Sequence, residues 1–337
     1  MRFGLRFDFR NPATVGSTTG TGTGTVGTGT STADQYAAAL DMAAWADRLG
    51  CASITLSEHH GSADGYLPSP IPMLAAMAAR TEQVRFAIAA LVAPFYDPLR
   101  LAEDLIVLDN LCRGRLDLIV GGGYVPAEFD MFGVQAKDRP ARVTEVVTTL
   151  KAAFAGRPFD YRGHTVQITP APFRPGGPSV SLGGSSEGAA RRAARIADGF
   201  FPTDPKLWDF YRDELRQLGR PHPGPCPLGS GSLLVALAED PEQGWQQMAP
   251  FFLHQANAYG AWQAASSVAT PYRIVPDTDA LRATGQFRVL TPDQLIAELR
   301  AAPAPFANFH PLVGGMPIDL AWSSLRLFEH EVLPVLG

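Results

Sequence analysis

Three consecutive stretches in the middle of the chain carry the clearest pattern: VRFAIAALV (Val84–Val92), LRLAEDLIVLDNL (Leu99–Leu111) and RLDLIVGGG (Arg115–Gly123). The first is apolar after Arg85, which is typical of a parallel strand covered on both faces. The second has the length of a crossover helix, and the third is a strand that ends in glycines. Because parallel strands need such a crossover, the order strand, helix, strand predicts a parallel sheet.

The same alternation continues toward both ends of the chain. Further strands are predicted at residues 2–7, 52–56, 179–182, 199–202, 233–237 and 306–310. Helices are predicted at residues 35–49, 71–80, 141–155, 187–197, 206–218 and 319–333, and residues 241–300 are expected to be helical with an irregular middle. Eight strands alternating with helices predict one α/β domain over residues 1–337, a (β/α)8 TIM barrel. The rival is an open doubly wound sheet, which usually has fewer strands and a G-x-G-x-x-G turn after its first strand.

Two segments stand outside this alternation. Residues 16–32 are Gly, Thr and Ser apart from Val26, and such a composition cannot bury enough surface to offset its ordering entropy. We predict a flexible loop there, with the hypothesis that it is a mobile lid at the active-site face. Residues 156–178 are predicted to be a proline-rich excursion.

Composition and charge exclude several classes of protein. The 337 residues carry a formal net charge of −5, and no basic run forms a track for nucleic acid. No apolar run reaches the roughly 18 residues of a membrane span. Cys51, Cys112 and Cys226 are odd in number and widely spaced, which indicates thiols in a reducing compartment. These features predict a soluble cytoplasmic protein.

In a barrel of this kind the active site lies at the carboxyl ends of the strands. This rule selects short segments that follow the predicted strands: Ser57–His60, Ala93–Tyr96, Gly121–Tyr124, Gly183–Ser186 and His310. The apolar side chains near this face predict a largely hydrophobic substrate pocket; they are Phe95, Tyr96, Phe129, Met131 and Phe132.

The segment Gly183-Gly184-Ser185-Ser186 opens the helix predicted at residues 187–197. Free backbone N–H groups, two hydroxyls and the positive end of the helix dipole would meet there, which suits a phosphate. The alternative is ordinary helix capping by Ser185 or Ser186.

The segment Glu58-His59-His60 has three interpretations. Neighbouring residues of a strand point to opposite faces, so at most one histidine lines the barrel mouth easily. That histidine could act as an acid or base near neutral pH, or could be a buried structural residue. A metal site would need a third ligand from His310 or Glu128, but the chain has no H-E-x-x-H motif. Gly121, Gly122 and Gly123 indicate either close approach of a bulky group or a plain turn.

Taken in order, these segments resemble the bacterial-luciferase-like family of flavin-dependent monooxygenases and oxidoreductases. The resemblance rests on SEHH (57–60), AALVAP (89–94), DPLRLAED (97–104), LDNLCRGR (108–115), GGY (122–124), EFDMFG (128–133), GGS (183–185) and AARIADG (193–199). It implies a TIM barrel, usually dimeric, that binds reduced FMN or the deazaflavin F420.

The resemblance implies a two-component monooxygenase in which a separate flavin reductase supplies reduced FMN and the enzyme uses O2. The substrate would be a small, largely apolar organic molecule, and the expected assembly is a homodimer. An F420-dependent oxidoreductase on the same barrel is the first alternative. A non-catalytic luciferase-like subunit or flavin-binding module is the second.

The resemblance also assigns residues. His59 matches the histidine that serves as acid or base, and His60 beside it is a second catalytic candidate. Ala89 and Ala90 match a non-proline cis peptide beneath the flavin ring, and Glu58 matches a residue near that ring. The remaining cofactor-binding candidates are Gly121, Gly122, Gly123 and Tyr124, and the phosphate turn Gly183, Gly184, Ser185 and Ser186. No metal is implied.

One position departs from the family pattern. Many FMN-dependent relatives carry an arginine in the block after the fourth strand that pairs with the FMN phosphate, whereas this chain has Gly122. The phosphate charge would then be met by the helix terminus, or by an arginine from elsewhere such as Arg139 or Arg142. This departure keeps F420 open as the cofactor.

Overall fold

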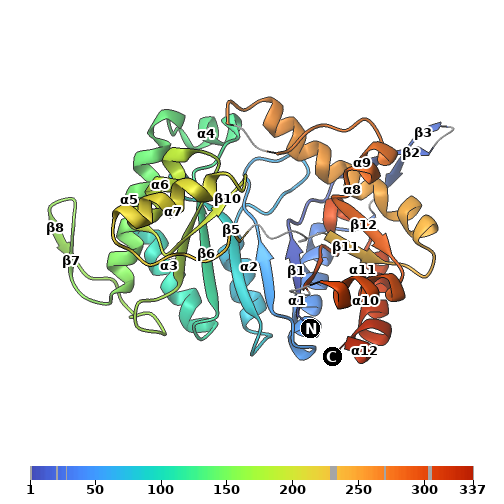
Figure 1. Ribbon diagram of the computed structural model, residues 1–337, viewed down its shortest axis with the longest axis horizontal. Helices are drawn as coiled ribbons and strands as arrows, with labels where there is room; N and C mark the ends of the chain where they lie inside the picture. The colour runs from blue at the N-terminus through green and yellow to red at the C-terminus, as the bar shows by residue number, and fades with distance from the viewer. Residues whose placement is uncertain are drawn as a thin grey trace.

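A parallel sheet of nine strands forms the centre of the computed structural model, which describes residues 2–19, 22–27, 29–227, 234–268, 271–302 and 306–336 (Figure 1). Its hydrogen-bonded order is β10-β9-β6-β5-β4-β1-β13-β11-β12, with every neighbouring pair parallel. The strands are β1 (Arg2–Phe7), β4 (Ser53–Leu56), β5 (Arg85–Val92), β6 (Leu116–Gly121), β9 (Ser179–Gly184), β10 (Gly199–Pro202), β11 (Leu234–Leu237), β12 (Phe287–Leu290) and β13 (Phe306–Phe309).

Helices cover the outside of these strands, as Figure 1 shows. Helix α5 packs on β6, α6 on β9 and β10, and α11 on β11. The helices are α1 (Thr32–Arg48), α2 (Pro70–Ala78), α3 (Pro98–Leu111), α4 (Pro126–Phe132), α5 (Arg139–Phe154), α6 (Glu187–Ile196), α7 (Leu207–Gln217), α8 (Pro241–Ala264), α9 (Thr278–Thr284), α10 (Pro292–Ala301), α11 (Ile318–Leu327) and α12 (Leu333–Leu336), with a π-helical turn (Phe328–Val332) before the last. The predicted α/β barrel class is confirmed.

Strand β1 shows how the sequence pattern places the core. Phe3 packs on Trp45 of α1 and on Phe328, and Phe7 is fully buried on the same side. Burial of one such ring contributes about 1.5–3 kcal/mol. Successive side chains of a strand alternate between faces, so Arg6 points to the barrel interior, where it donates to Ser57 Oγ at 2.9 Å. Polar residues of the strands therefore face the space in which a site can form.

The structure describes both segments outside this alternation and corrects the prediction for one of them. The described residues of the segment 16–32 do not form the predicted flexible loop, because β2 (Thr14–Thr19) and β3 (Gly22–Gly27) pair as an antiparallel hairpin beside α8, whereas residues 20, 21 and 28 lie outside the described residues. Threonine is β-branched and suits an extended chain, and Val15 at the start of the hairpin is buried. The excursion at 156–178 contains a second hairpin, β7 (Phe159–Tyr161) with β8 (His164–Val166).

Residues 241–300, which we expected to be helical with an irregular middle, contain the helices α8, α9 and α10, and the expectation needs correction at one place. They also contain the strand β12, which pairs with β11. Its four residues are too short a run to show a period of two against the surrounding helices. Residue 233, the predicted start of the seventh strand, lies outside the described residues.

Asp47 in the last turn of α1 fixes that helix to the start of β5. Its carboxylate accepts the backbone N–H groups of Glu82, Gln83 and Val84 at 2.8, 2.8 and 2.7 Å. Burial by itself would raise the pKa of Asp47, but these three hydrogen bonds and nearby Arg115 hold it below the ordinary value. The ionised carboxylate therefore stabilises the fold.

We expect Asp47→Ala to lower the free energy of unfolding by about 3 kcal/mol at pH 7, because three backbone donors lose their acceptor. A depressed pKa means that the stabilisation is complete above the ordinary aspartate pKa and is lost as pH falls through the native value. Urea unfolding of both proteins at pH 7 and at lower pH measures this. A difference that stays constant as the solution is acidified would contradict the assignment to the ionised form.

Among the described residues, no helix combines the length and the hydropathy that a membrane span requires. Cys51 and Cys112 are buried free thiols and Cys226 is half-buried. Burial raises the pKa of Cys51 to about 12, so this thiol is unreactive at neutral pH.

Candidate active site

His59 and His60 follow β4 and point to different sides of the barrel mouth. The ring of His59 lies among Tyr66, Tyr124 and Trp262, whereas the ring of His60 lies against Phe95 and Phe132. The alternation of side chains along a strand predicted that the two imidazole rings would lie on different sides. The two histidines therefore have different surroundings and cannot share one chemical role.

His59 is held by a carboxylate on one edge and by a ring on its face. Its Nδ1 is 2.7 Å from Glu128 Oε1 of α4, and Trp262 of α8 lies over it with ring centroids 4.2 Å apart. Glu128 is 1% exposed and also accepts the backbone N–H of His60 at 3.0 Å. With Nδ1 as the donor to this carboxylate, Nε2 is the nitrogen that can accept a proton, and it has no partner among the described residues.

His60 belongs to a second polar group centred on Glu58, which is 2% exposed. Glu58 Oε1 accepts from His60 Nε2 and from the Tyr96 hydroxyl, both at 2.8 Å, and Oε2 accepts from Val92 N at 2.9 Å. Burial and the Glu58 carboxylate raise the pKa of Tyr96, so the phenol stays protonated and donates. Glu58 thus anchors the end of β5 to the histidine segment.

The peptide between Ala89 and Ala90 in β5 is cis, as the family resemblance implied. The carbonyl of Ala89 accepts from Ser57 Oγ at 2.7 Å, and Ser57 in turn accepts from Arg6. A Cβ built on Gly121 of β6 would lie 2.9 Å from Ala90 Cβ, so this glycine lets the two strands meet at the cis peptide. The alanines present only methyl groups and backbone to the barrel mouth.

Arg139, the first residue of α5, occupies the space above Gly122. A Cβ built on Gly122 would lie 2.9 Å from Arg139 Cγ, and the guanidinium donates to the carbonyl of Gly123 at 2.9 Å. Arg142, the other arginine considered from the sequence, lies elsewhere and donates to the carbonyl of Pro94 at 3.2 Å. The structure therefore places Arg139, and not Arg142, where the family arginine is missing.

The glycine-serine turn after β9 lines a cavity of about 380 Å³. Its polar lining comes from four places in the chain: Ser185 and Ser186 of the turn, Arg139 of α5, Arg192 of α6, and Ser267 after α8. Burial lowers the pKa of both arginines, and neither has a carboxylate within ion-pair distance among the described residues. Two cations without counter-ions and a helix N-terminus make this cavity attractive to an anion.

Two further residues of the turn have defined positions. Ser186 is the N-cap of α6 and accepts from Ala189 N at 3.2 Å, so the capping alternative is confirmed for this serine. A Cβ built on Gly184 would lie 2.5 Å from Ala189 Cβ, which explains the glycine by packing. Ser185 and the free N–H groups of the first turn remain available to a ligand.

Tyr124 follows the three glycines and completes the wall beside His59. Its hydroxyl is buried and has no hydrogen-bond partner among the described residues. Burial raises the pKa of Tyr124, so it is a neutral donor at physiological pH. An unsatisfied buried donor is costly, which marks this hydroxyl as one that a bound ligand could satisfy.

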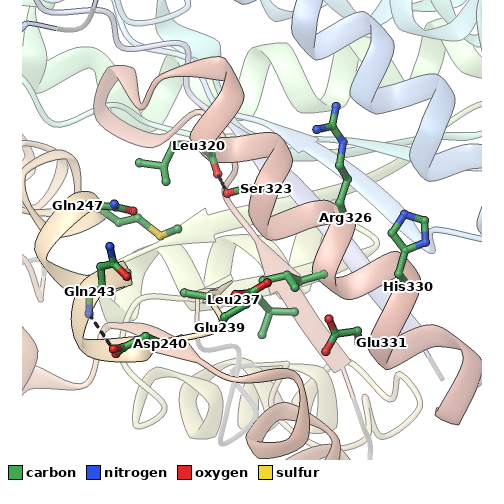
Figure 2. A pocket seen from close by; sticks show the side chains of 14 residues that line it. Leu237, Glu239, Asp240, Gln243, Gln247, Leu320, Ser323, Arg326, His330 and Glu331 are labelled. Carbon is green, nitrogen blue, oxygen red and sulfur yellow. Dashed lines mark hydrogen bonds between the residues drawn. The ribbon is translucent and has the colours of Figure 1, made fainter.

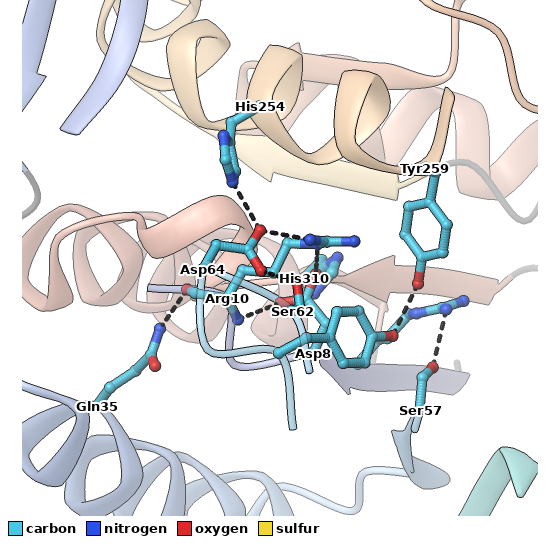
Figure 3. A network of polar contacts seen from close by, with 11 residues as sticks. Asp8, Arg10, Gln35, Ser57, Ser62, Asp64, His254, Tyr259 and His310 are labelled. Atoms are coloured by element: carbon cyan, nitrogen blue, oxygen red, sulfur yellow. Dashed lines mark hydrogen bonds and ion pairs between the residues drawn. The ribbon is translucent and has the colours of Figure 1, made fainter. Parts of the chain in front are cut away.

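Two charged residues after β1, which were not predicted from the sequence, also lie at the carboxyl end of a strand. Asp8 and Arg10 follow that strand directly and are at most 1% exposed, in a polar network with Asp64, His254 and His310 (Figure 3). Charged residues immediately after an apolar strand are the sequence signal that could have found them. The partners from α8 are distant in sequence and carry no such signal.

The metal interpretation of the histidines gains no support from the geometry. Glu128 does contact His59, but as a hydrogen-bond acceptor, and His310 instead lies 3.5 Å from Asp8. In the part of the chain that the structure describes, no three His, Cys, Asp or Glu side chains gather as metal ligands.

A second hollow of about 350 Å³ lies on the outer side, between the start of α8 and α11 with its π-helical turn (Figure 2). It contains none of the residues predicted from the strand ends. Asp240 there already caps α8 by accepting from Gln243 N at 3.2 Å, and the side chains of Arg326 and His330 are exposed. We therefore place the candidate site at the strand ends.

Known proteins resemble this chain over most of its length. A family model described as luciferase-like monooxygenase matches residues 1–304. The crystal structure of monooxygenase RslO1 from Streptomyces bottropensis superposes with a TM-score of 0.74 and 25% identity over 100% of both chains.

Two further similar proteins have names that state different cofactors. The oxygenating constituent of 3,6-diketocamphane monooxygenase from Pseudomonas putida, in complex with FMN, shares the fold with a TM-score of 0.65 and 18% identity, over 91% of this chain and 94% of that one. The F420-dependent glucose-6-phosphate dehydrogenase of Microbacterium testaceum is 31% identical over 188 residues, which are 52% of this chain and 55% of that protein.

Proposed function

The chain belongs to the luciferase-like monooxygenase family, and from that premise we propose that it is a monooxygenase that uses reduced FMN and O2. The observation that carries the proposal is the pair of partly buried arginines without counter-ions beside the glycine-serine turn. Such a cradle suits a phosphate monoester, which FMN carries.

The residues of the cavity fit the cofactor that we propose. Arg139 and Arg192 would balance the phosphate charge, and Ser185 would donate a hydrogen bond beside the N-terminus of α6. The methyl groups of Ala89 and Ala90 would allow a flat ring to lie close to the backbone. Reduced FMN, when bound, supplies the electrons with which O2 is activated for transfer of one oxygen atom to the substrate.

The role of the chain is then to bind, orient and exclude water. His59 would hold or accept a proton at Nε2, because Glu128 fixes Nδ1 as the donating nitrogen. The surrounding rings keep this imidazole away from bulk water, since His59 is 7% exposed. Tyr124 would donate its free hydroxyl to a bound ligand.

The substrate that fits this mouth is small and largely apolar. Phe95 stacks on Phe132 at 4.6 Å between ring centroids and also contacts Phe129, so three rings line the approach on the side of α4. Met131 beside them is 63% exposed, which suits a residue at the rim of a hydrophobic entrance. We further propose that a separate flavin reductase supplies the reduced cofactor and that the enzyme is a homodimer.

F420 is the second candidate cofactor. It also carries a phosphate, and the similarity to an F420-dependent dehydrogenase over half the chain favours it. In that case the enzyme would transfer a hydride without using O2. The Glu-His-His segment resembles the FMN branch of the family more closely, and we therefore keep FMN as the first choice.

Titration of the full chain with reduced FMN under anaerobic conditions, oxidised FMN and F420 tests the proposal by fluorescence and absorbance. We expect saturable binding of reduced FMN. Binding of F420 without binding of either form of FMN would replace the FMN assignment. Failure of all three to bind would overturn the enzymatic proposal and favour a non-catalytic luciferase-like subunit.

A further inference from the structure

Arg10 and His59 contact the same three aromatic rings. The Arg10 guanidinium carbon lies 4.7 Å from the ring centroid of Tyr66, 5.1 Å from Tyr259 and 4.4 Å from Trp262. The His59 ring centroid lies 4.9, 5.8 and 4.2 Å from the same rings in the same order. The three rings thus form a shared ring cage between a buried cation and the proposed proton-transfer residue.

Arg10 is held in place by two carboxylates, one of which also contacts a histidine of α8. Its Nη1 donates to Asp64 Oδ2, and its Nε lies 3.8 Å from Asp8 Oδ2. Asp64 also accepts from His254 Nε2 of α8 at 2.8 Å, as Figure 3 shows. The loops after β1 and β4 and the helix α8 are therefore joined at one ion cluster.

The backbone links this cluster to the segment that carries His59. Leu67 N donates to the carbonyl of Asp8 at 2.9 Å, and His59 N donates to the carbonyl of Leu67 at 3.3 Å. The hydroxyls of Tyr66 and Tyr259 are 2.7 Å apart, which ties the same loop to α8. Any displacement of Arg10 would reach His59 through the rings and through this loop.

The charge of Arg10 is expensive to bury, since the side chain is 1% exposed. Its Nε and Nη2 have no hydrogen-bond partner among the described residues, and the guanidinium instead lies over ring faces. An apolar side chain in the same space would leave the buried carboxylates of Asp8 and Asp64 without this counter-ion. The cation therefore joins the two carboxylates to the three rings and holds both in place.

We infer that Arg10 is a positioning residue, which keeps the ring cage closed on His59 so that Nε2 faces the reacting molecule. The inference rests on the proposed function for its catalytic meaning. The Asp64–His254 pair connects Arg10 to α8. Trp262 is the cage ring that lies nearest to both Arg10 and His59.

NMR of the full-length protein with labelled histidines tests this inference without any cofactor or substrate. Trp262 lies over His59, so its ring current displaces the His59 signals, which are identified by their loss in His59→Gln. We expect Arg10→Met to move these signals toward the position of free histidine. Arg10→Lys, which keeps the charge, should restore part of the displacement.

His254 provides a second pair of variants on a side chain that is 25% exposed and so tolerates change. His254→Gln can still donate to Asp64 and should leave the His59 signals in place, whereas His254→Leu should move them. Folded Arg10→Met with unchanged His59 signals would overturn the inference, and if that variant does not fold, unchanged signals in His254→Leu would do so.

Arg139→Met serves as the matched control, because Arg139 lies over Phe129 and donates to the carbonyl of Gly123, and among the described residues it contacts none of the three cage rings. It should leave the His59 signals unchanged and weaken only cofactor binding. Displaced signals in Arg10→Met together with a failed cofactor titration would retain the positioning role and reject the proposed function. Unchanged His59 signals in Arg10→Met together with saturable binding of reduced FMN would reject the positioning role and retain the proposed function.

Discussion

Replacement of both Arg139 and Arg192 by methionine is expected to weaken the binding of reduced FMN by about 100-fold. Each arginine would make a charge-assisted contact with the phosphate, and both side chains are partly exposed, so about 1.4 kcal/mol is lost with each. Methionine keeps the aliphatic part of Arg139 that packs over Gly122, which separates charge from packing. Fluorescence titration at two salt concentrations measures the change.

Arg142→Met is the matched control for this prediction. Arg142 lies one turn further along α5 and donates to the carbonyl of Pro94, away from the glycine-serine cavity. It should leave the dissociation constant unchanged and should not alter its salt dependence. If the double variant bound reduced FMN as tightly as the native protein, the phosphate would not lie in this cavity.

Gly314→Ala is expected to cost about 4 kcal/mol of unfolding free energy. Gly314 follows β13 with φ +60°, and a Cβ there would lie 2.2 Å from the backbone oxygen of Phe251 in α8. The left-handed backbone costs about 1–2 kcal/mol for alanine, and the collision adds about 2–3 kcal/mol because a helix must move. Since α8 carries Trp262, the displacement would also open the ring cage.

Gly285→Ala separates the two contributions. Gly285 has φ +68° with nothing within 4 Å of a built Cβ, so only the backbone strain applies and the loss should stay near 1–2 kcal/mol. Urea unfolding of the two variants and the native protein gives both differences. Equal losses of unfolding free energy in the two variants would show that the backbone of α8 does not collide with a side chain at position 314.

The sequence predicted the barrel because its signals are local. The apolar runs that became β1, β5 and β6 and the helices between them need only period, length and the crossover rule. The hairpin of β2 and β3 was not predicted, because alternating glycine and threonine residues give no apolar face from which a period of two could be read. Strand β12 was not predicted, because its four residues are too few to show a period of two.

The candidate site was predictable where it depends on strand ends and not where it depends on long-range pairing. His59, Glu58 and the glycine-serine turn follow strands directly, and family resemblance gave the cis peptide at Ala89. The choice between Arg139 and Arg142 needed the direction of α5, which no residue pattern gives.

The ring cage shows the same limit more strongly. Trp262 is about two hundred residues from His59 along the chain. Its contact with that imidazole exists only because α8 crosses the barrel mouth. Asp8 and Arg10 were within reach of the strand-end rule, but their partners on α8 were not.

The most direct test of the proposed cofactor site is a crystal structure of the protein grown anaerobically with reduced FMN. We predict that the phosphate lies in the cavity lined by Ser185 and Arg139, with the ring against the Ala89–Ala90 peptide and on the side of the mouth that His59 faces. A phosphate bound outside this cavity, such as in the hollow beside α11, would contradict the account.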